Sequence, residues 1–140
     1  MKDLHSNISI QSILHPIGIT ATATYDDIDL AGANSAEIVI DIGLDAALAA
    51  GAYWTFHLYH SNDGTTYTAV ADDDMLGVSS IIAGLFLTVD STDEDNTAYN
   101  FGYVGGQQYL RLIVTEAGTA LTGPMCIMII KSHLQDVPAL

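Results

Sequence analysis

Hydrophobic and polar residues alternate with a period of two over several stretches of the chain. Successive side chains of a β-strand point to opposite faces, so this alternation predicts strands with one buried and one solvated face. The three clearest stretches are residues 36–42, 52–60 and 109–115, whose apolar faces carry Ile38, Ile40 and Ile42, then Trp54, Phe56 and Leu58, and then Leu110, Leu112 and Val114.

A second kind of strand is predicted at residues 125–130, where every position is apolar. Such a run is typical of a strand that is covered on both sides. It contains Cys126, the only cysteine of the chain, which we expect to be a small buried hydrophobe. Weaker strands are predicted at residues 8–13, 19–25, 85–89 and 97–104.

Turn sequences separate these strands. Asp63-Gly64 and Gly105-Gly106 supply the positive φ angles that tight hairpins need, whereas residues 44–50 and 72–76 have room only for a helical turn. Short strands with regular turns predict an all-β fold, an antiparallel β-sandwich. A jelly-roll-like order is favoured, and an immunoglobulin-like sandwich is the alternative because both show the same alternation.

The length of 140 residues suits one domain, so we expect residues 1–140 to form a single β-sandwich. Residues 1–17 are either an N-terminal arm or the first strand of that sandwich.

Charge excludes several classes of protein. Three basic and seventeen acidic residues give a formal net charge of −14, and Lys2, Arg111 and Lys131 are too dispersed to form the basic patch of a nucleic-acid-binding protein. The hydrophobic fraction of 49% argues against a disordered chain. No apolar run approaches the ~18 residues of a membrane-spanning helix. We therefore expect a folded protein without nucleic-acid or membrane partners.

Catalytic motifs are not apparent. The chain has no nucleophile elbow, phosphate-binding loop or Cys-x-x-Cys pair. His57 and His60 are three apart on a predicted strand, which sends them to opposite faces and makes a shared metal unfavourable. The acidic runs 72–74 and 90–95 lack the EF-hand order and are expected to be solvated loops. We expect no enzyme activity, catalytic residue, cofactor or metal.

Arg111 stands out as one of three basic residues among seventeen acids. Its guanidinium is expected to find an anionic partner. Two interpretations are open: a salt bridge within the fold, or a contact across an interface.

The order of several segments is also informative. It resembles that of a family of small tailed-bacteriophage head proteins, which are encoded beside the major capsid protein. The segments that carry this resemblance are Met1–Asn7, Ser61–Gly64, Tyr67–Gly77, Gly102–Gly105 and Tyr109–Leu112.

The resemblance implies a capsid decoration, or cement, protein that binds the outer surface of the head and stabilises the shell. Its partners would be the major capsid protein and further copies of itself, as a dimer or trimer. A charge of −14 is repelled by packed DNA, which places the protein on the virion exterior after its synthesis in the host cytoplasm. The candidate residues for contact with the capsid or a sister subunit are Leu4, His5, Ile8, Ile10, Tyr109 and Arg111.

The alternative function is a carbohydrate- or host-surface-binding jelly-roll module on the virion. In that case tyrosine rings would provide stacking faces for a glycan beside acidic hydrogen-bond acceptors. The candidates are Tyr53, Tyr59, Tyr99 and Tyr103.

The acids are concentrated in predicted turns, and the predicted strands hold almost none. This pattern predicts an orientation in which acidic loops face water and a less charged edge or arm faces the capsid.

Overall fold

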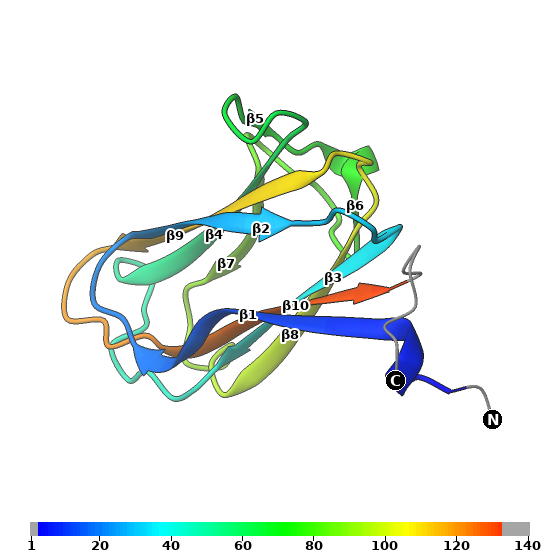
Figure 1. Ribbon diagram of the computed structural model, residues 1–140. Helices are drawn as coiled ribbons and strands as arrows, with labels where there is room; N and C mark the ends of the chain where they lie inside the picture. The colour runs from blue at the N-terminus through cyan, green and yellow to red at the C-terminus, as the bar shows by residue number, and fades with distance from the viewer. Residues whose placement is uncertain (1–2, 133–140) are drawn as a thin grey trace.

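The computed structural model describes residues 3–132 of the chain, and the regular secondary structure of these residues is almost entirely β-strand (Figure 1). Two single-turn 3-10 helices, η1 (His5–Asn7) and η2 (Asp72–Asp74), are the helical segments of this part of the chain. The strands are β1 (Ile8–Gly18), β2 (Ala23–Asp29), β3 (Ser35–Ile42), β4 (Tyr53–Ser61), β5 (Thr68–Ala69), β6 (Met75–Leu76), β7 (Leu85–Val89), β8 (Thr97–Tyr103), β9 (Tyr109–Ala117) and β10 (Pro124–Ser132).

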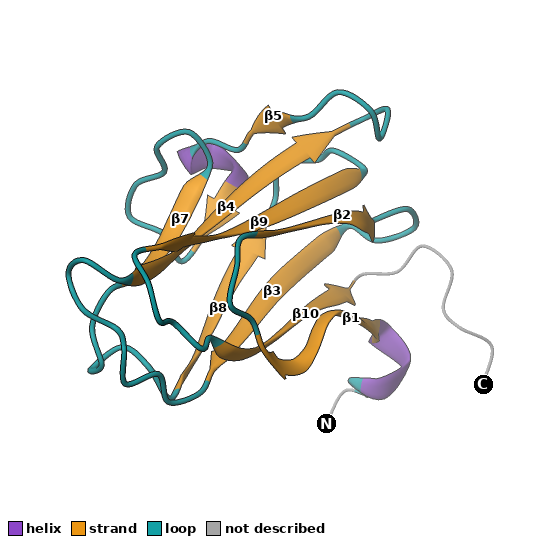
Figure 2. Cartoon of the chain, turned by 90° about the vertical axis from the view of Figure 1, so that its left-hand side faces the viewer, coloured by secondary structure: helices purple, strands orange, loops and turns teal. Residues whose placement is uncertain are grey.

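The strands form two antiparallel sheets that face each other, as Figure 2 shows. One sheet has the order β1-β10-β3-β8-β6, and the other has the order β2-β9-β4, with β5 and β7 pairing along the far side of β4. The predicted all-β sandwich is therefore confirmed.

The pairing is nested: β1 pairs with β10, β2 with β9, β3 with β8 and β4 with β7. This is the order of a jelly roll, in which the chain is folded double and then wrapped into two sheets. An immunoglobulin-like sandwich would order its sheets ABED and CFG, so the jelly-roll prediction is correct.

The core lies between the sheets and follows the predicted alternation. In β4 the side chains of Trp54, Phe56 and Leu58 are completely buried, and the matching positions of β3 and β9 are at most 1% exposed. Each strand thus places one apolar row inward because its side chains alternate.

The prediction for residues 125–130 was wrong on one point. Met125, Ile127 and Ile129 are buried, but Cys126 and the other outward residues of β10 are only half-buried, because residues 3–132 place no second layer over them. The outer face of this strand is therefore apolar and accessible.

The strand predicted from residue 19 begins only at Ala23. The N–H of Ile19 donates instead to the carbonyl of Gly123 at 3.2 Å, where the chain turns from one sheet to the other. The segment before it, Ile8–Gly18, is the first strand of a sheet and pairs with β10.

Acids are less confined to turns than the sequence suggests. Six of them lie within strands: Asp26, Asp27 and Asp29 in β2, Glu37 and Asp41 in β3, and Glu116 in β9. Neither 3-10 turn has the length or apolar character of a membrane-spanning helix.

Candidate interaction surfaces

The structure places the six candidate contact residues in two groups. Leu4 and Ile10 are 67% and 59% exposed, and with His5 in η1 and Ile8 in β1 they lie at the start of one sheet. Tyr109 and Arg111 lie on β9 in the other sheet, on its outer face. Within each group the residues are neighbours, but the two groups belong to different sheets.

β1 and β2 are terminal strands of their sheets and lie on one side of the sandwich (Figure 1), whereas the outer faces that carry Ile10 and Arg111 belong to the two opposite sheets. A hollow of about 410 Å³ between these strands is lined by residues 11–13 and by Thr24–Asp26 and Ile28. Asp26 also lines a second hollow of about 330 Å³, together with Tyr67, Tyr109 and Arg111. Of the six predicted contact residues, Tyr109 and Arg111 line the second hollow, and the other four line neither hollow.

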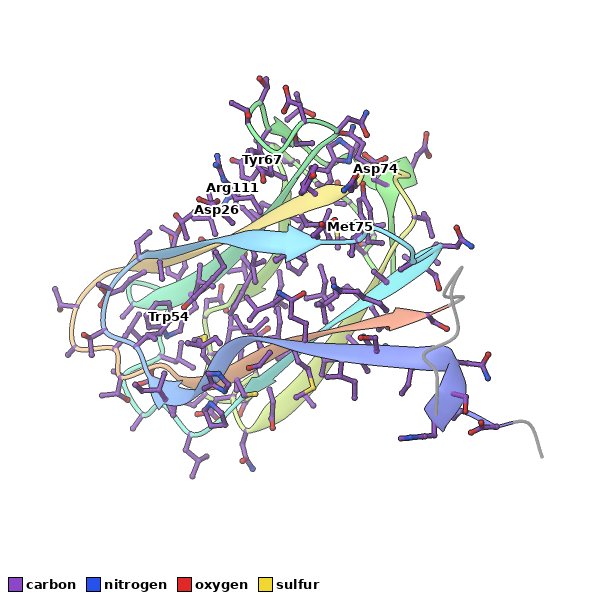
Figure 3. The ribbon with its side chains drawn as sticks, in the orientation of Figure 1. Asp26, Trp54, Tyr67, Asp74, Met75 and Arg111 are labelled. Carbon is purple, nitrogen blue, oxygen red and sulfur yellow. The ribbon has the colours of Figure 1, made fainter. Side chains whose placement is uncertain are left out.

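Arg111 is the centre of a compact cluster at the second hollow. Its Nε donates a hydrogen bond to Oδ1 of Asp26, and its guanidinium lies 4.0 Å from the centroid of the Tyr67 ring (Figure 3). Tyr59 is its cross-strand neighbour on β4. We call Tyr59, Tyr67, Tyr109 and Arg111 the Tyr–Arg patch.

The salt bridge of Arg111 is formed within the fold, which is one of the two interpretations that the sequence left open. The side chains of Arg111 and Asp26 remain 32% and 50% exposed, so a partner molecule still reaches both. A guanidinium presents five donors, of which the Asp26 bond uses the Nε donor. The ion pair and the ring fix the position of the cation without removing it from the surface.

The hairpin 61–66 supports this patch. Oδ1 of Asp63 accepts hydrogen bonds from the N–H groups of Thr66 and Thr65 and from Oγ of Ser61, at 2.7–2.8 Å. These bonds favour the ionised carboxylate and lower the pKa of Asp63 to about 2. Gly64 takes a φ of +69°, and a Cβ there would lie 3.5 Å from the Tyr109 ring.

Ser61 therefore belongs to a turn. Its Oγ donates to Asp63 and accepts from the N–H of Gly64. The neighbouring His60 points the other way, into the core, where its Nδ1 lies 2.9 Å from the hydroxyl of Tyr103. The half-buried His57 lies on the opposite face of β4, as the odd spacing requires.

Two of the segments that carry the family resemblance pack against each other. Met75 and Leu76 of β6 pair with Tyr103 and Gly102 of β8, and the N–H of Val104 donates to the carbonyl of Asp74 at 2.8 Å. The two segments are about 25 residues apart in sequence, yet they form one structural unit at one end of the sandwich. Asp74 and Met75 are labelled at this end in Figure 3.

The four tyrosines proposed as a glycan platform are not on one surface. Tyr103 is buried, and Tyr99 points inward beside the core and donates its hydroxyl to the carbonyl of Glu94. Tyr53 and Tyr59 lie on the outer face of β4, six residues and therefore about 20 Å apart. One sugar therefore cannot stack on several of these rings at once.

At the opposite end of the sandwich, Asp45 is a buried carboxylate that the sequence did not indicate. It is 1% exposed, and its Oδ2 accepts hydrogen bonds from the N–H groups of Thr122 and Gly123 at 3.1 and 2.9 Å. The indole N–H of Trp54 lies 3.5 Å from the same oxygen. The backbone N–H of Asp45 donates to Oδ2 of the buried Asp95 at 2.9 Å.

Burial acts to raise the pKa of Asp45, but the hydrogen bonds from Gly123, Thr122, Ala47 and Trp54 outweigh it, so the pKa is lowered. Asp45 joins the loops 43–52, 90–96 and 118–123 through these bonds. We refer to this region as the Asp45 end.

The expectation that the acidic run 90–95 is solvated throughout was wrong for one residue, because Asp95 is only 8% exposed. In the second run, Oδ1 of Asp72 accepts from the N–H of Ile81, and Oδ2 of Asp74 accepts from the N–H of Ala71. Within residues 3–132 no three His, Cys, Asp or Glu side chains are grouped so that they would hold a metal ion.

Comparison with known proteins gives a likeness in fold. No known family matches the sequence, and no curated protein is similar to it. The structure of the SPBc2 prophage-derived protein YomS is similar with a TM-score of 0.53 at 12% identity, covering 89% of this chain and 92% of that one. The infectious bursal disease virus VP2 subviral particle gives a TM-score of 0.38 at 15% identity, covering 94% of this chain and 34% of that one.

Proposed function

We propose that this chain is a virion structural protein, a decoration protein that binds the outer surface of a tailed-phage head and stabilises the shell. The observation that carries the proposal is the jelly-roll fold of the described residues, together with its likeness in fold to a prophage-derived protein over 89% of this chain and 92% of that one. Because a fold alone hosts many functions, the resemblance of the turn segments to phage head proteins is the second support.

The charge agrees with an exterior position. A net charge of −14 is repelled by packed DNA inside a head, whereas on the outside it keeps particles dispersed. A protein that binds only the assembled shell stabilises that shell by mass action, without any catalytic step.

The surface that we assign to the capsid is the Tyr–Arg patch. Tyrosine and arginine are enriched among the residues that dominate binding energy in protein interfaces. Here Arg111 is already held by Asp26 and Tyr67, so little side-chain entropy is lost on binding. The patch also offers one of the few cations of the molecule to an acidic or polar capsid surface.

The test is binding of the purified protein to empty, expanded heads that lack it, measured by co-sedimentation and by imaging of the particles. We expect stoichiometric binding and added density on the outer shell. Absence of the protein from mature virions, or density inside the shell, would contradict the proposal.

A matched pair of variants tests the assigned surface. Arg111→Ala is expected to weaken binding to heads at least 10-fold. Lys131→Ala changes the net charge by the same amount but lies on β10, where its Nζ donates to the carbonyl of Asp29, and it is expected to change affinity less than 2-fold. Equal effects of the two variants would show that only charge matters and not the patch.

A further inference from the structure

The edges of the two sheets are protected unequally. A free strand edge invites pairing with another chain, and proteins blunt such edges with short strands, charges or bulges. β5 and β6 have two residues each, and β7, which pairs only with β4, has five. β2 carries Asp26, Asp27 and Asp29 and an irregular register between Tyr25 and Ile28. β1 has 11 residues and none of these charges.

β1 also lies in the longest stretch of this strongly acidic chain that contains no charged residue. From Leu4 to Tyr25 the sequence contains no Asp, Glu, Lys or Arg. Two molecules with a charge of −14 repel each other across most of their surfaces, and this repulsion is smallest where neither surface carries charge. The β1 edge is therefore a part of the molecule that a second copy approaches at low electrostatic cost.

An apolar row ends in solvent at this edge. Ile10 pairs with Ile130 of β10, and both side chains lie on the outer face of the sheet. Ile10 is 59% exposed, and Leu4 and Ile17 at the two ends of the strand are 67% and 59% exposed. Apolar side chains of an added strand would extend this row beyond Ile10, on the side away from β10.

The register of β1 limits where a strand can be added. Pairing with β10 is regular from Ile8 to Ser12 and becomes irregular between Ser12 and Leu14 and again before Ile17. Pro16 has no N–H to donate and adds a second limit on that side. The usable edge is therefore Ile8–Ser12, with Ile10 at its centre.

We propose that two copies of this chain associate by antiparallel pairing of their β1 edges around a two-fold axis at Ile10. Ile10 of one copy then faces Ile10 of the other, and Ile8 faces Ser12, which is the self-complementary arrangement that two-fold symmetry requires. The β1-containing sheets of the two copies then form one continuous sheet. Its outer face carries a row that runs from Ile130 of one copy through the Ile10 side chains of both copies to Ile130 of the other. Strand addition of this kind is a general mode of recognition.

This dimer rests on the proposed function, which includes association of the protein with copies of itself. It is tested in solution without capsids. If the protein dimerises but does not bind heads, the decoration role fails alone. If it binds heads as a monomer, the dimer fails alone.

The experiment is site-directed disulfide formation in a Cys126→Ser background. Facing residues of an antiparallel pair have Cα atoms about 4.5–5.5 Å apart, which a disulfide spans. Ile10→Cys is expected to give a covalent dimer under mild oxidation. Ser9→Cys, one residue away, would not face itself, and Ile82→Cys, at a position that is 74% exposed, lies in a remote loop, so both are expected to remain monomers.

A second variant works without cross-linking. Ile10→Lys places two cations at the two-fold axis and is expected to convert the dimer to a monomer in light-scattering measurements. The fold should be unchanged because Ile10 is exposed. A monomeric wild-type protein at millimolar concentration, equal cross-linking of the three cysteine variants, or a dimer that survives Ile10→Lys would each overturn the proposal.

Discussion

The two ends of the sandwich use charged side chains in opposite ways. At the Asp45 end a carboxylate is buried and its oxygens accept hydrogen bonds from two backbone N–H groups, so the charge joins three loops. At the other end Arg111 is held by one carboxylate and one ring but stays accessible. The difference indicates that one end maintains the fold, whereas the other presents a surface.

The largest expected effect is at the Asp45 end. Asp45→Ala leaves the N–H groups of Thr122 and Gly123 without their acceptor, and loss of several charge-assisted bonds should lower the free energy of unfolding by about 3–4 kcal/mol. Urea denaturation measures this. Asp93→Ala removes an equal charge from an exposed position in a neighbouring loop and should change stability by less than about 0.5 kcal/mol. A loss below 1 kcal/mol for Asp45→Ala would show that the loops are held by other contacts.

A smaller effect is expected at the other end from Gly105→Ala. A Cβ at Gly105 would lie 2.7 Å from Oδ1 of Asp74 and 2.8 Å from the ring and hydroxyl of Tyr103. Because Tyr103 is buried, this overpacking should cost about 1–3 kcal/mol. The matched control is Gly51→Ala, where a Cβ meets nothing within 4 Å and the thermal midpoint should not fall.

Arg111→Ala should affect stability still less. Its ion pair and ring contact are both partly exposed, so together they contribute about 1 kcal/mol or less. Chemical denaturation of this variant, beside the head-binding assay, separates the two roles. A loss of more than 2 kcal/mol would mean that Arg111 is a structural residue and would weaken the contrast between the ends.

The smallest effect concerns protonation of Asp63. Its folded pKa, about 2, lies below the ordinary value of 3.8, so its hydrogen bonds stabilise the hairpin 61–66 above pH 4 and are lost as the pH falls through 2. The amide signals of Thr65 and Thr66 should therefore titrate with a midpoint near pH 2. A midpoint near pH 4 would show that these bonds do not favour the ionised form.

Sequence reasoning identified the strands well because a strand's alternation is local. The rows Trp54, Phe56, Leu58 and Ile38, Ile40, Ile42 are buried as predicted. The strand at 19–25 was misplaced because its start depends on Gly123, which lies about 100 residues farther along the chain.

The site was harder to predict for the same reason. Asp45 is a single acid with no motif, and its donors come from Trp54 and from residues 122–123 in another loop. Arg111 was recognised as needing an anion, but only the pairing of β2 with β9 identifies Asp26 as that anion. The Cys126 face of β10 was predicted as buried, since an apolar sequence does not reveal whether a second layer exists.

The nested pairing of the strands has a consequence for the time at which this protein acquires its structure. β10 lies between β1 and β3, so the sheet has no continuous centre until the last strand has been made. From Gly18, where β1 ends, to Pro124, where β10 begins, the ribosome adds 124 − 18 = 106 residues, which takes roughly 5–20 s. During that interval β1 is part of the nascent chain and has not yet paired with β10, so its apolar residues stay exposed. Folding of the sandwich is therefore expected to begin only after β10 has been synthesised, and contacts between distant segments make it slow.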